Sequence, residues 1–489
     1  MKTERMDHPN ILLILTDQLR KTSLGCYGNP DAQTPVIDGI CRDGLRFDNS
    51  VSSAPVCAPY RTTLQSGLYP HQHGVRGNGD LFRPCFKGLA EYFNEAGYET
   101  CFVGKSHFGR DEIEEKDGWV RPENRLGWKH WYGTGGDHHY DTPIYDDAGN
   151  LDTRFFGKYG AFVRTELAVN FVREKKEKPW LLQLNYSEPH VATMPALYQM
   201  PATREYVRTI NRKLELGLSE KILNNPSSLS FYDTLPQHLL TQLLPQSYLD
   251  LYDPEYLRLD PNVPERWKRV TRLFLQEYYA MISCIDGEIG KLMDVLKETG
   301  QLQRTIVIFT SDHGDMLSNG YLRFKGVPYQ NAFRTPLIVA GPGVRKGYTD
   351  TLVSSVDMMP TLLELSGLKK PEILPGVSVA ADIFGQEECR QNAVLLGLAT
   401  WRGIYDGRYF YAVDNRSGAI RPIRLIDTQQ DPYDMNNLNH FESYEPLRKR
   451  MHSLLVEKLL RVKDCDFLAC EYSVKQGENR NHIFCASEL

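Results

Sequence analysis

The sequence predicts an α/β fold: a large, mostly parallel sheet flanked by helices, followed by a smaller antiparallel α+β subdomain. Two observations predict it. Short apolar runs alternate with helical patterns along most of the chain, which is typical of strands and helices around a parallel sheet. After roughly residue 385 the pattern changes to short strands and one closing helix. We therefore expect a main domain over residues 1–385 and a C-terminal subdomain over residues 386–489.

The individual elements follow from apolar runs and their period. Buried strands are expected at residues 11–15, 180–184, 305–309 and 336–340. Apolar residues recur at three- and four-residue steps from Phe274 to Leu296, which predicts one long amphipathic helix that stops before Gly300. In the C-terminal part we expect strands at residues 408–413 and 423–426 and a helix near residues 445–462.

Two stretches interrupt this alternation and are expected to be insertions. Residues 111–157 are rich in Gly, Asp, His and Trp, and residues 190–265 are rich in Pro, Asn and Leu. Irregular insertions frequently carry binding residues. In the first stretch, His138, His139 and Tyr140 are therefore candidate substrate contacts.

Composition excludes several classes of partner. The chain has 489 residues, of which 41% are hydrophobic and 24% charged, as in ordinary soluble globular proteins. Its net charge of −5 argues against general polyanion binding, and no basic groove with interleaved aromatic residues is evident. We expect no nucleic-acid partner, whereas a homo-oligomer stays open.

The first residues and the cysteines bear on the compartment. Residues 1–9 contain no apolar signal-peptide core, and residues 11–15 are too few to span a membrane. The ten cysteines are scattered, which favours reduced thiols over a disulfide framework. We expect a cytoplasmic protein without membrane attachment, or a periplasmic or secreted one if a leader was removed.

Polar side chains follow two of the predicted strands. Asp17 and Gln18 come after the first strand, and Asp312 and His313 after the strand at residues 305–309. Ligands collect at the carboxyl ends of strands in such sheets. Two carboxylates, an amide oxygen and an imidazole suit a divalent cation that prefers oxygen ligands. The alternative is that each aspartate only caps a helix.

Cys57 allows three interpretations. Most free cysteines are small buried hydrophobic residues. A cysteine at a helix N-terminus can instead be a thiolate nucleophile, because the helix end lowers its pKa. The third interpretation comes from its surroundings: residues 57–61 carry the pattern Cys-x-Pro-x-Arg, ending at Arg61.

This pattern resembles the type I, cysteine-type sulfatases of the alkaline phosphatase superfamily. The resemblance implies an alkaline-phosphatase-like mixed sheet and oxidation of Cys57 to formylglycine (3-oxoalanine). One hydroxyl of the formylglycine hydrate would bind the metal and attack sulfur, and the other would later eject sulfate. Arg61 would hold the hydrate, and Pro59 would belong to the motif that a formylglycine-generating or sulfatase-maturating enzyme reads. The following residues depart from the family's ending at Ser66 and Leu68, which bears on the efficiency of maturation.

Two segments extend the resemblance within the main domain. Residues 104–109 resemble the family's Gly-Lys-Trp-His-Leu-Gly, which implies that Lys105 and His107 hold sulfate oxygens and the bridging oxygen. Residues 187–190 resemble a Pro-His segment, which implies that His190 faces the leaving group. A histidine there can protonate the departing oxygen, and we favour His190 over His107 for that role.

The last matches lie nearer the C-terminus. Lys325 matches the family's Gly-Lys-Gly lysine, a second clamp on sulfate, and residues 425–438 match its Leu-Tyr-Asp, Asp-Pro and Asn-Leu pattern. Preorganised cations stabilise the charge that develops on the transferring group. The implied catalytic residues are Cys57, Arg61, Lys105, His107, His190 and Lys325, and the implied metal ligands are Asp17, Gln18, Cys57, Asp312 and His313.

The resemblance implies a sulfuric ester hydrolase that acts on a sulfated carbohydrate or small organic sulfate. Calcium is the preferred ion because the ligands are mostly hard oxygens, and His313 leaves magnesium or manganese open. The closest alternative is a phosphonate monoester hydrolase or phosphodiesterase of the same superfamily, which the motif at Lys105 disfavours. An inactive, sugar-binding homologue is the alternative of another class, and the occupied catalytic positions argue against it.

Overall fold

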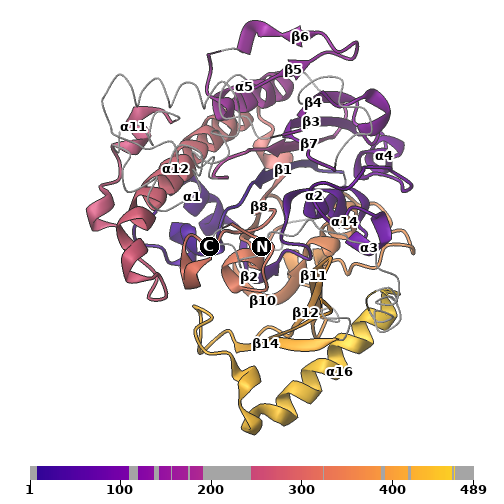
Figure 1. Ribbon diagram of the computed structural model, residues 1–489. Helices are drawn as coiled ribbons and strands as arrows, with labels where there is room; N and C mark the ends of the chain where they lie inside the picture. Colours follow the sequence, from indigo (N-terminus) through magenta and orange to yellow (C-terminus); the bar gives the residue numbers. More distant parts are fainter. Residues whose placement is uncertain are drawn as a thin grey trace.

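The computed structural model describes residues 8–109, 119–136, 142–155, 157–174, 177–190, 244–322, 324–386, 391–416, 420–464 and 467. Its main part is an eight-stranded sheet in the order β10-β2-β9-β8-β1-β7-β3-β4 (Figure 1). The strands are β1 Asn10–Thr16, β2 Leu45–Val51, β3 Glu99–Lys105, β4 His130–Thr134, β7 Trp180–Asn185, β8 Thr305–Ser311, β9 Leu337–Ala340 and β10 Gly347–Ser354. The predicted mixed, mostly parallel sheet is confirmed.

One strand, β9, runs antiparallel to both of its neighbours, β8 and β2. After β8 the chain does not cross over the sheet, and β9 therefore starts at the edge where β8 ends. The connection between them, which contains α13 (Gln330–Phe333), stays at that edge. All the other pairings in the sheet are parallel, so β1, β2, β3, β7 and β8 end at this same edge.

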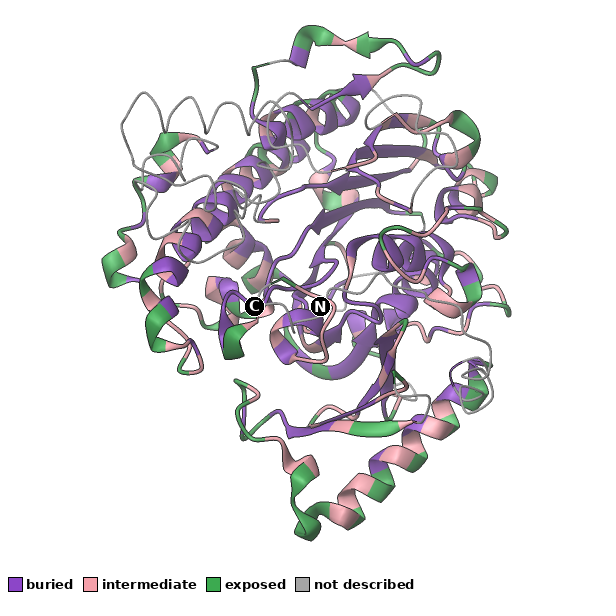
Figure 2. Cartoon of the chain, viewed as in Figure 1, coloured by how far each residue is buried: buried purple, intermediate pink, exposed green. Residues whose placement is uncertain are grey.

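Helices cover both faces of the sheet (Figures 1 and 2). On β1, Leu12 and Ile14 face one apolar cluster, while Ile11, Leu13 and Leu15 face the other. This two-sided burial explains why the strand is apolar throughout instead of alternating. The first face carries α1 (Pro35–Asp43), α5 (Gly160–Arg173) and α12 (Lys268–Glu298), and the second carries α2 (Cys57–Ser66), α4 (Leu89–Glu95), α14 (Met358–Leu365) and α15 (Ala380–Ile383).

The long helix predicted at residues 274–296 is α12, which begins six residues earlier. Two short strands, β5 (Ile144–Tyr145) and β6 (Leu151–Asp152), pair as a small separate sheet, and α11 (Gln246–Leu249) packs on α12. The edge strand β4 and this small sheet fall within the stretch at residues 111–157. Of the stretch at residues 190–265, residues 191–243 lie outside the described part.

The C-terminal part is a separate four-stranded antiparallel sheet, as predicted. Its strands are β11 Val394–Leu398, β12 Trp401–Tyr405, β13 Tyr409–Asp414 and β14 Arg421–Asp427. One face packs on α16 (Glu445–Arg461), for example Tyr411 and Leu425 against Met451 and Leu455. The other face joins the main domain in an apolar cluster that includes Val51, Phe333 and Trp401. This cluster holds the C-terminal sheet against β2 and α13, at the edge where the parallel strands end.

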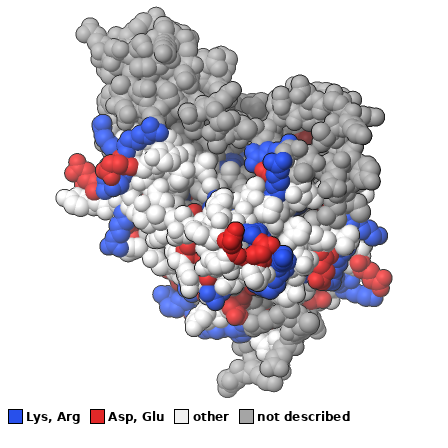
Figure 3. Space-filling model, turned by 60° about the horizontal axis from the view of Figure 1, so that its bottom comes forward, with Lys and Arg blue, Asp and Glu red and all other residues white. Residues whose placement is uncertain are grey.

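Surface properties agree with the composition. On the face seen in Figure 3, acidic and basic side chains are interspersed and do not form one basic patch. Within the part of the chain that the structure describes, no helix has both the length and the apolarity needed to span a bilayer.

A buried histidine in α3 (Pro70–His73) makes the fold sensitive to acid. His73 Nδ1 accepts the Val75 amide at 3.2 Å, so Nε2 carries the hydrogen and faces Thr63 Oγ1 at 3.1 Å. The ring is thus held neutral, and burial, followed by the charge of His71, lowers the pKa of His73 to about 3. In the unfolded chain His73 has its ordinary pKa of 6.5 and is protonated below that pH. In the folded chain it stays neutral until the pH approaches about 3.

Stability should therefore fall as the pH drops from about 6.5 towards 4, with His73 contributing up to ~1.4 kcal/mol per pH unit. We expect His73→Gln to flatten the dependence of the unfolding midpoint on pH in thermal melts. His440→Gln, the same change at an exposed position, is the control. An unchanged pH dependence in His73→Gln would contradict the assignment.

Candidate active site

The candidate residues meet at one edge because each follows the carboxyl end of a parallel strand. Asp17 follows β1 and Asp312 follows β8, and these strands pair as far as Thr16 and Ser311. Cys57, after β2, is the first residue of α2, so it lies at the positive end of a helix that is buried throughout. The sheet edge thus collects residues that are far apart in the chain, such as Gln18 and Lys325, which are 307 positions apart.

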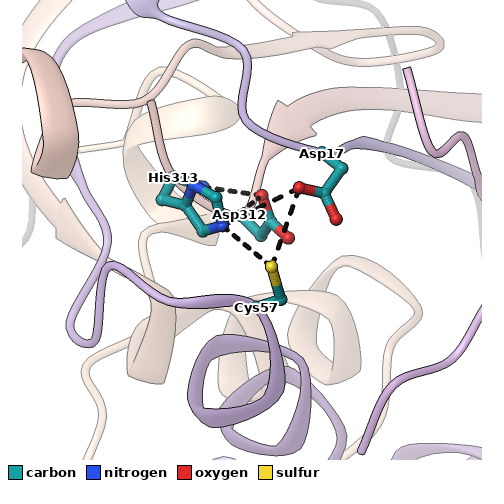
Figure 4. A group of neighbouring side chains, drawn as sticks. All are labelled: Asp17, Cys57, Asp312 and His313. Carbon is teal, nitrogen blue, oxygen red and sulfur yellow. Dashed lines mark hydrogen bonds and ion pairs between the residues drawn. The ribbon is translucent and has the colours of Figure 1, made fainter. Parts of the chain in front are cut away.

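The four predicted side chains Asp17, Cys57, Asp312 and His313 form one compact, fully buried group (Figure 4). Cys57 Sγ lies 3.2 Å from His313 Nε2 and 3.8 Å from Asp17 Oδ1. His313 Nε2 lies 3.5 Å from Asp312 Oδ1. One ligand atom of each residue lies within 4.8 Å of the others, so this donor set fits a single metal ion.

Gln18 joins the group through both its backbone and its side chain. Its backbone, in the left-handed region at φ 67°, donates to Asp312 Oδ1 at 3.0 Å. Its side-chain amide donates to Asp315, and its Oε1 accepts from Lys325 Nζ at 2.5 Å. A carboxylate only accepts and an ammonium only donates, so the amide between them has one satisfied orientation. The Gln18 oxygen therefore faces the site.

Asp315 is a site residue that the sequence analysis missed. It is buried, and its second carboxylate oxygen accepts the Leu317 amide. Its position three residues after Asp312, in the same polar loop, is the signal that could have indicated it. Only the structure shows that its side chain turns towards Gln18.

Two cations balance the buried carboxylates. Arg61 Nη2 lies 3.1 Å from Asp17 Oδ2 and 3.0 Å from Asp312 Oδ2, and the Arg61 side chain is 1% exposed. Arg61 also donates to the backbone oxygen of Lys105 at 2.7 Å, while Lys105 Nζ pairs with Asp17. Buried charges require such partners, because an unpaired one would lose its hydration without compensation.

The charges act on the titration of the group. Burial, together with the neighbouring charge of Asp17, raises the pKa of Asp312 to about 6. Burial also acts to raise the pKa of Asp17, but Lys105 and the other cations hold it well below its usual value. Two carboxylates that repel in this way form a site that a cation would stabilise.

The pKa of Cys57 reports the sign of the field where its side chain lies. Burial and Asp17 both act to raise it, but Lys105, Lys325 and His313 outweigh them and hold the Cys57 pKa well below its usual value. Negative charge is therefore favoured at this position, next to the helix N-terminus.

The remaining candidates surround this centre to different degrees. Lys325 Nζ lies 2.6 Å from His190 Nε2, so both belong to the Gln18 side of the site. His107 stands two residues beyond Lys105 with φ 43°, and its buried Nδ1 has no hydrogen-bond partner among the described residues. The candidates His138, His139 and Tyr140 lie outside the described part of the chain.

Comparison with protein families now identifies the chain. Residues 9–368 match the sulfatase family, and residues 321–461 match the C-terminal region of N-sulphoglucosamine sulphohydrolase. The chain belongs to the sulfatase family. The predicted resemblance to type I sulfatases of the alkaline phosphatase superfamily is confirmed.

Individual sulfatases are similar over nearly the whole chain. The ulvan-active sulfatase of Formosa agariphila is 29% identical over 490 residues, which cover 97% of this chain and 85% of that protein. The N-acetylglucosamine-6-O-sulfatase of Bacteroides thetaiotaomicron is 26% identical and covers 98% and 91%. The solved structure of the sulfatase yidJ from Bacteroides fragilis has a TM-score of 0.78 at 23% identity, covering 95% and 98%. This sulfatase is accordingly a sulfuric ester hydrolase.

Proposed function

We propose that this sulfatase removes sulfate from a sulfated carbohydrate or a small organic sulfate, using a formylglycine derived from Cys57 and a divalent cation. The observation that carries the proposal is the position of Cys57, which begins a buried helix beside Asp17, Asp312 and His313. A carbohydrate sulfate is supported by the relative that is an N-acetylglucosamine-6-O-sulfatase.

The formylglycine hydrate would supply a nucleophilic hydroxyl and a second hydroxyl for releasing sulfate. The residues around Cys57 provide the field for this chemistry. Lys105, Lys325 and His313 favour negative charge at the Cys57 side chain, as its lowered pKa indicates. Arg61 is paired with Asp17 and Asp312, so it would hold these two carboxylates in position during the reaction without rearranging.

The cation would be held by Asp17, Asp312, His313 and the Gln18 oxygen. A bound cation would act as a Lewis acid on a sulfate oxygen and on the nucleophile. Calcium stays our first choice because three of these four ligands offer oxygen, and His313 keeps magnesium and manganese open.

The departing alcohol needs a proton, and the Lys325–His190 pair can provide it. Lys325 Nζ donates to His190 Nε2 at 2.6 Å, so this ring nitrogen accepts and a neutral imidazole carries its hydrogen on Nδ1. His190 would give the Nδ1 proton to the departing alkoxide while its Nε2 takes a proton from Lys325. We assign His190 as the general acid and His107 to the bridging oxygen.

Maturation would require a transient encounter with a formylglycine-generating or sulfatase-maturating enzyme. In the folded chain Cys57 is 1% exposed and all of α2 is buried. The encounter would therefore take place before α2 packs against the sheet.

The alternative function is phosphonate monoester hydrolysis, which uses the same fold. The match of residues 104–109 to the sulfatase motif, with Lys105 paired to Asp17, favours the sulfate ester. A comparison of kcat/KM for an aryl sulfate and an aryl phosphonate monoester distinguishes the two. Preference for the phosphonate would overturn the proposal.

The first prediction concerns conversion of Cys57. Co-expression with a maturation enzyme should lower the mass of the peptide that contains Cys57 by ~18 Da, as thiol becomes aldehyde. Aryl sulfatase activity should rise in proportion to the converted fraction. Cys57→Ala should lose at least ~10³-fold in kcat/KM, because the nucleophile is absent.

The matched control is Cys284→Ala, which removes another buried thiol, in α12. Its peptide should keep its mass in the wild type, and the variant should keep its activity. Full activity in Cys57→Ala would refute a covalent role for this residue.

The second prediction concerns the cation. Chelator-stripped protein should bind one calcium ion in isothermal titration calorimetry, and Asp312→Ala should abolish the heat of binding. Asp315→Asn should weaken binding by about 10–100-fold, because an amide there no longer fixes the orientation of Gln18.

Asp260→Asn serves as the control, since Asp260 pairs with Arg20 at 3.0 Å near the same loop and contacts none of the proposed ligands in the described contacts. Its calcium affinity should match that of the wild type. Unchanged affinity in Asp312→Ala would show that the ion binds elsewhere.

The third prediction concerns the general acid. His190→Ala should slow a sugar sulfate by ~10²-fold or more while sparing 4-nitrophenyl sulfate, because only the poor leaving group needs a proton. His107→Ala should slow both substrates. If each variant slowed both substrates equally, neither histidine would be the acid.

A further inference from the structure

The side chain of Trp401, in the C-terminal sheet, donates a hydrogen bond to the loop that carries Lys325. This residue begins β12, is 4% exposed and donates its indole N–H to the backbone oxygen of Gly326 at 3.1 Å. Gly326 follows Lys325, whose ammonium group reaches Gln18 and His190. A residue of the small domain therefore bonds to the peptide next to a catalytic candidate.

Gly326 is also held from the opposite side. Its N–H donates to the backbone oxygen of Pro55 at 3.0 Å, two residues before Cys57. A Cβ at this position would lie 3.4 Å from Val56 and 3.6 Å from Leu398 of β11. The loop is thus fixed between the chain that enters α2 and the β11–β12 hairpin, and both peptide groups of Gly326 are bonded.

The hairpin is itself a firm support. The Gly397 amide donates to the backbone oxygen of Ser53 at 2.8 Å, which ties β11 to the same chain segment. The Trp401 ring packs in an apolar cluster with Val51 of β2, Phe333 of α13 and Tyr405 of its own strand, β12. Because this packing fixes the Trp401 ring, its hydrogen bond can hold the Gly326 backbone in one position.

The loop that leads to Lys325 needs such a support because several of its residues adopt unfavourable backbone conformations. Leu317, Ser318, Tyr321 and Phe324 all have positive φ, between 41° and 71°. Non-glycine residues adopt this region only when their surroundings hold them there, and such residues concentrate at functional sites. Lys325 adds a long side chain whose end can be placed accurately only if its backbone is fixed.

We infer that Trp401 is a positioning residue for Lys325, so that the C-terminal sheet is part of the active site through the backbone of Gly326. The inference rests on the proposed function, in which Lys325 stabilises negative charge beside the Cys57-derived nucleophile. Trp401 acts on catalysis only through Lys325, and its contribution disappears when Lys325 is removed.

A double-mutant cycle tests this dependence. Trp401→Phe keeps an aromatic ring and removes the donor, and should lower kcat/KM for an aryl sulfate by about 5–10-fold in matured enzyme, the effect of one lost hydrogen bond. In the Lys325→Ala background, the same change should lower kcat/KM by less than about 2-fold, because the two residues act as one unit. Tyr405→Phe, on the same strand, removes a hydroxyl that bonds Asn49 and the Gly407 backbone, and should leave kcat/KM unchanged.

Benzothienylalanine at position 401, which keeps the bicyclic ring and replaces the N–H by sulfur, is the second variant should Trp401→Phe fold poorly. It should reproduce the Lys325-dependent loss at an unchanged thermal midpoint. Equal losses in both backgrounds, or no loss in either variant, would overturn the inference while leaving the role of Lys325 intact. An unimpaired Lys325→Ala would instead refute the proposed role of Lys325, and the inference with it.

Discussion

The active site depends on holding two carboxylates, Asp17 and Asp312, side by side in the protein interior. The pairing of β1 with β8 forces them together, and both are fully buried. Such a pair is unfavourable unless cations lie against it. Arg61 contacts both carboxylates at about the distance of a hydrogen bond, and it can do so only because α2 begins at this edge and lies within the core. Because α2 brings Arg61 to the two carboxylates, it also places Cys57, one helical turn earlier, beside them.

Much of this arrangement could be predicted from the sequence because its elements are locally encoded. The strands β1, β7 and β8 are buried on both faces, so each is a continuous apolar run. The helix α12 shows a clear helical period over its length. Once the strands are known, the polar residues that follow β1 and β8 must lie at one edge, and Asp17, Asp312 and His313 do so.

Other features depend on tertiary contacts, and no pattern in the sequence indicates them. The strand β2 contains Arg46, Asp48 and Asn49 and does not read as an apolar run, although it pairs with both β9 and β10. The antiparallel direction of β9 follows from where the loop after β8 returns, which composition does not reveal. The orientation of the Gln18 amide depends on Asp315, and the anchoring of Gly326 on Trp401, 75 positions away.

The charge of the whole chain says little about the site. The protein carries a net charge of −5, and its two signs are mixed on the face in Figure 3, yet Cys57 experiences a positive local field. Lys105 and His313 contribute to this field from buried positions, where a charge is screened far less than at the surface. A sulfate ester brings negative charge into a site that already contains two carboxylates, so these carboxylates must be neutralised before an anion can bind. Arg61 and Lys105 do so within the fold, and Lys325, at the partly open side, is the cation that we propose meets the substrate. Lys325 is therefore the cation whose position needs external support, and the C-terminal sheet provides it through Gly326.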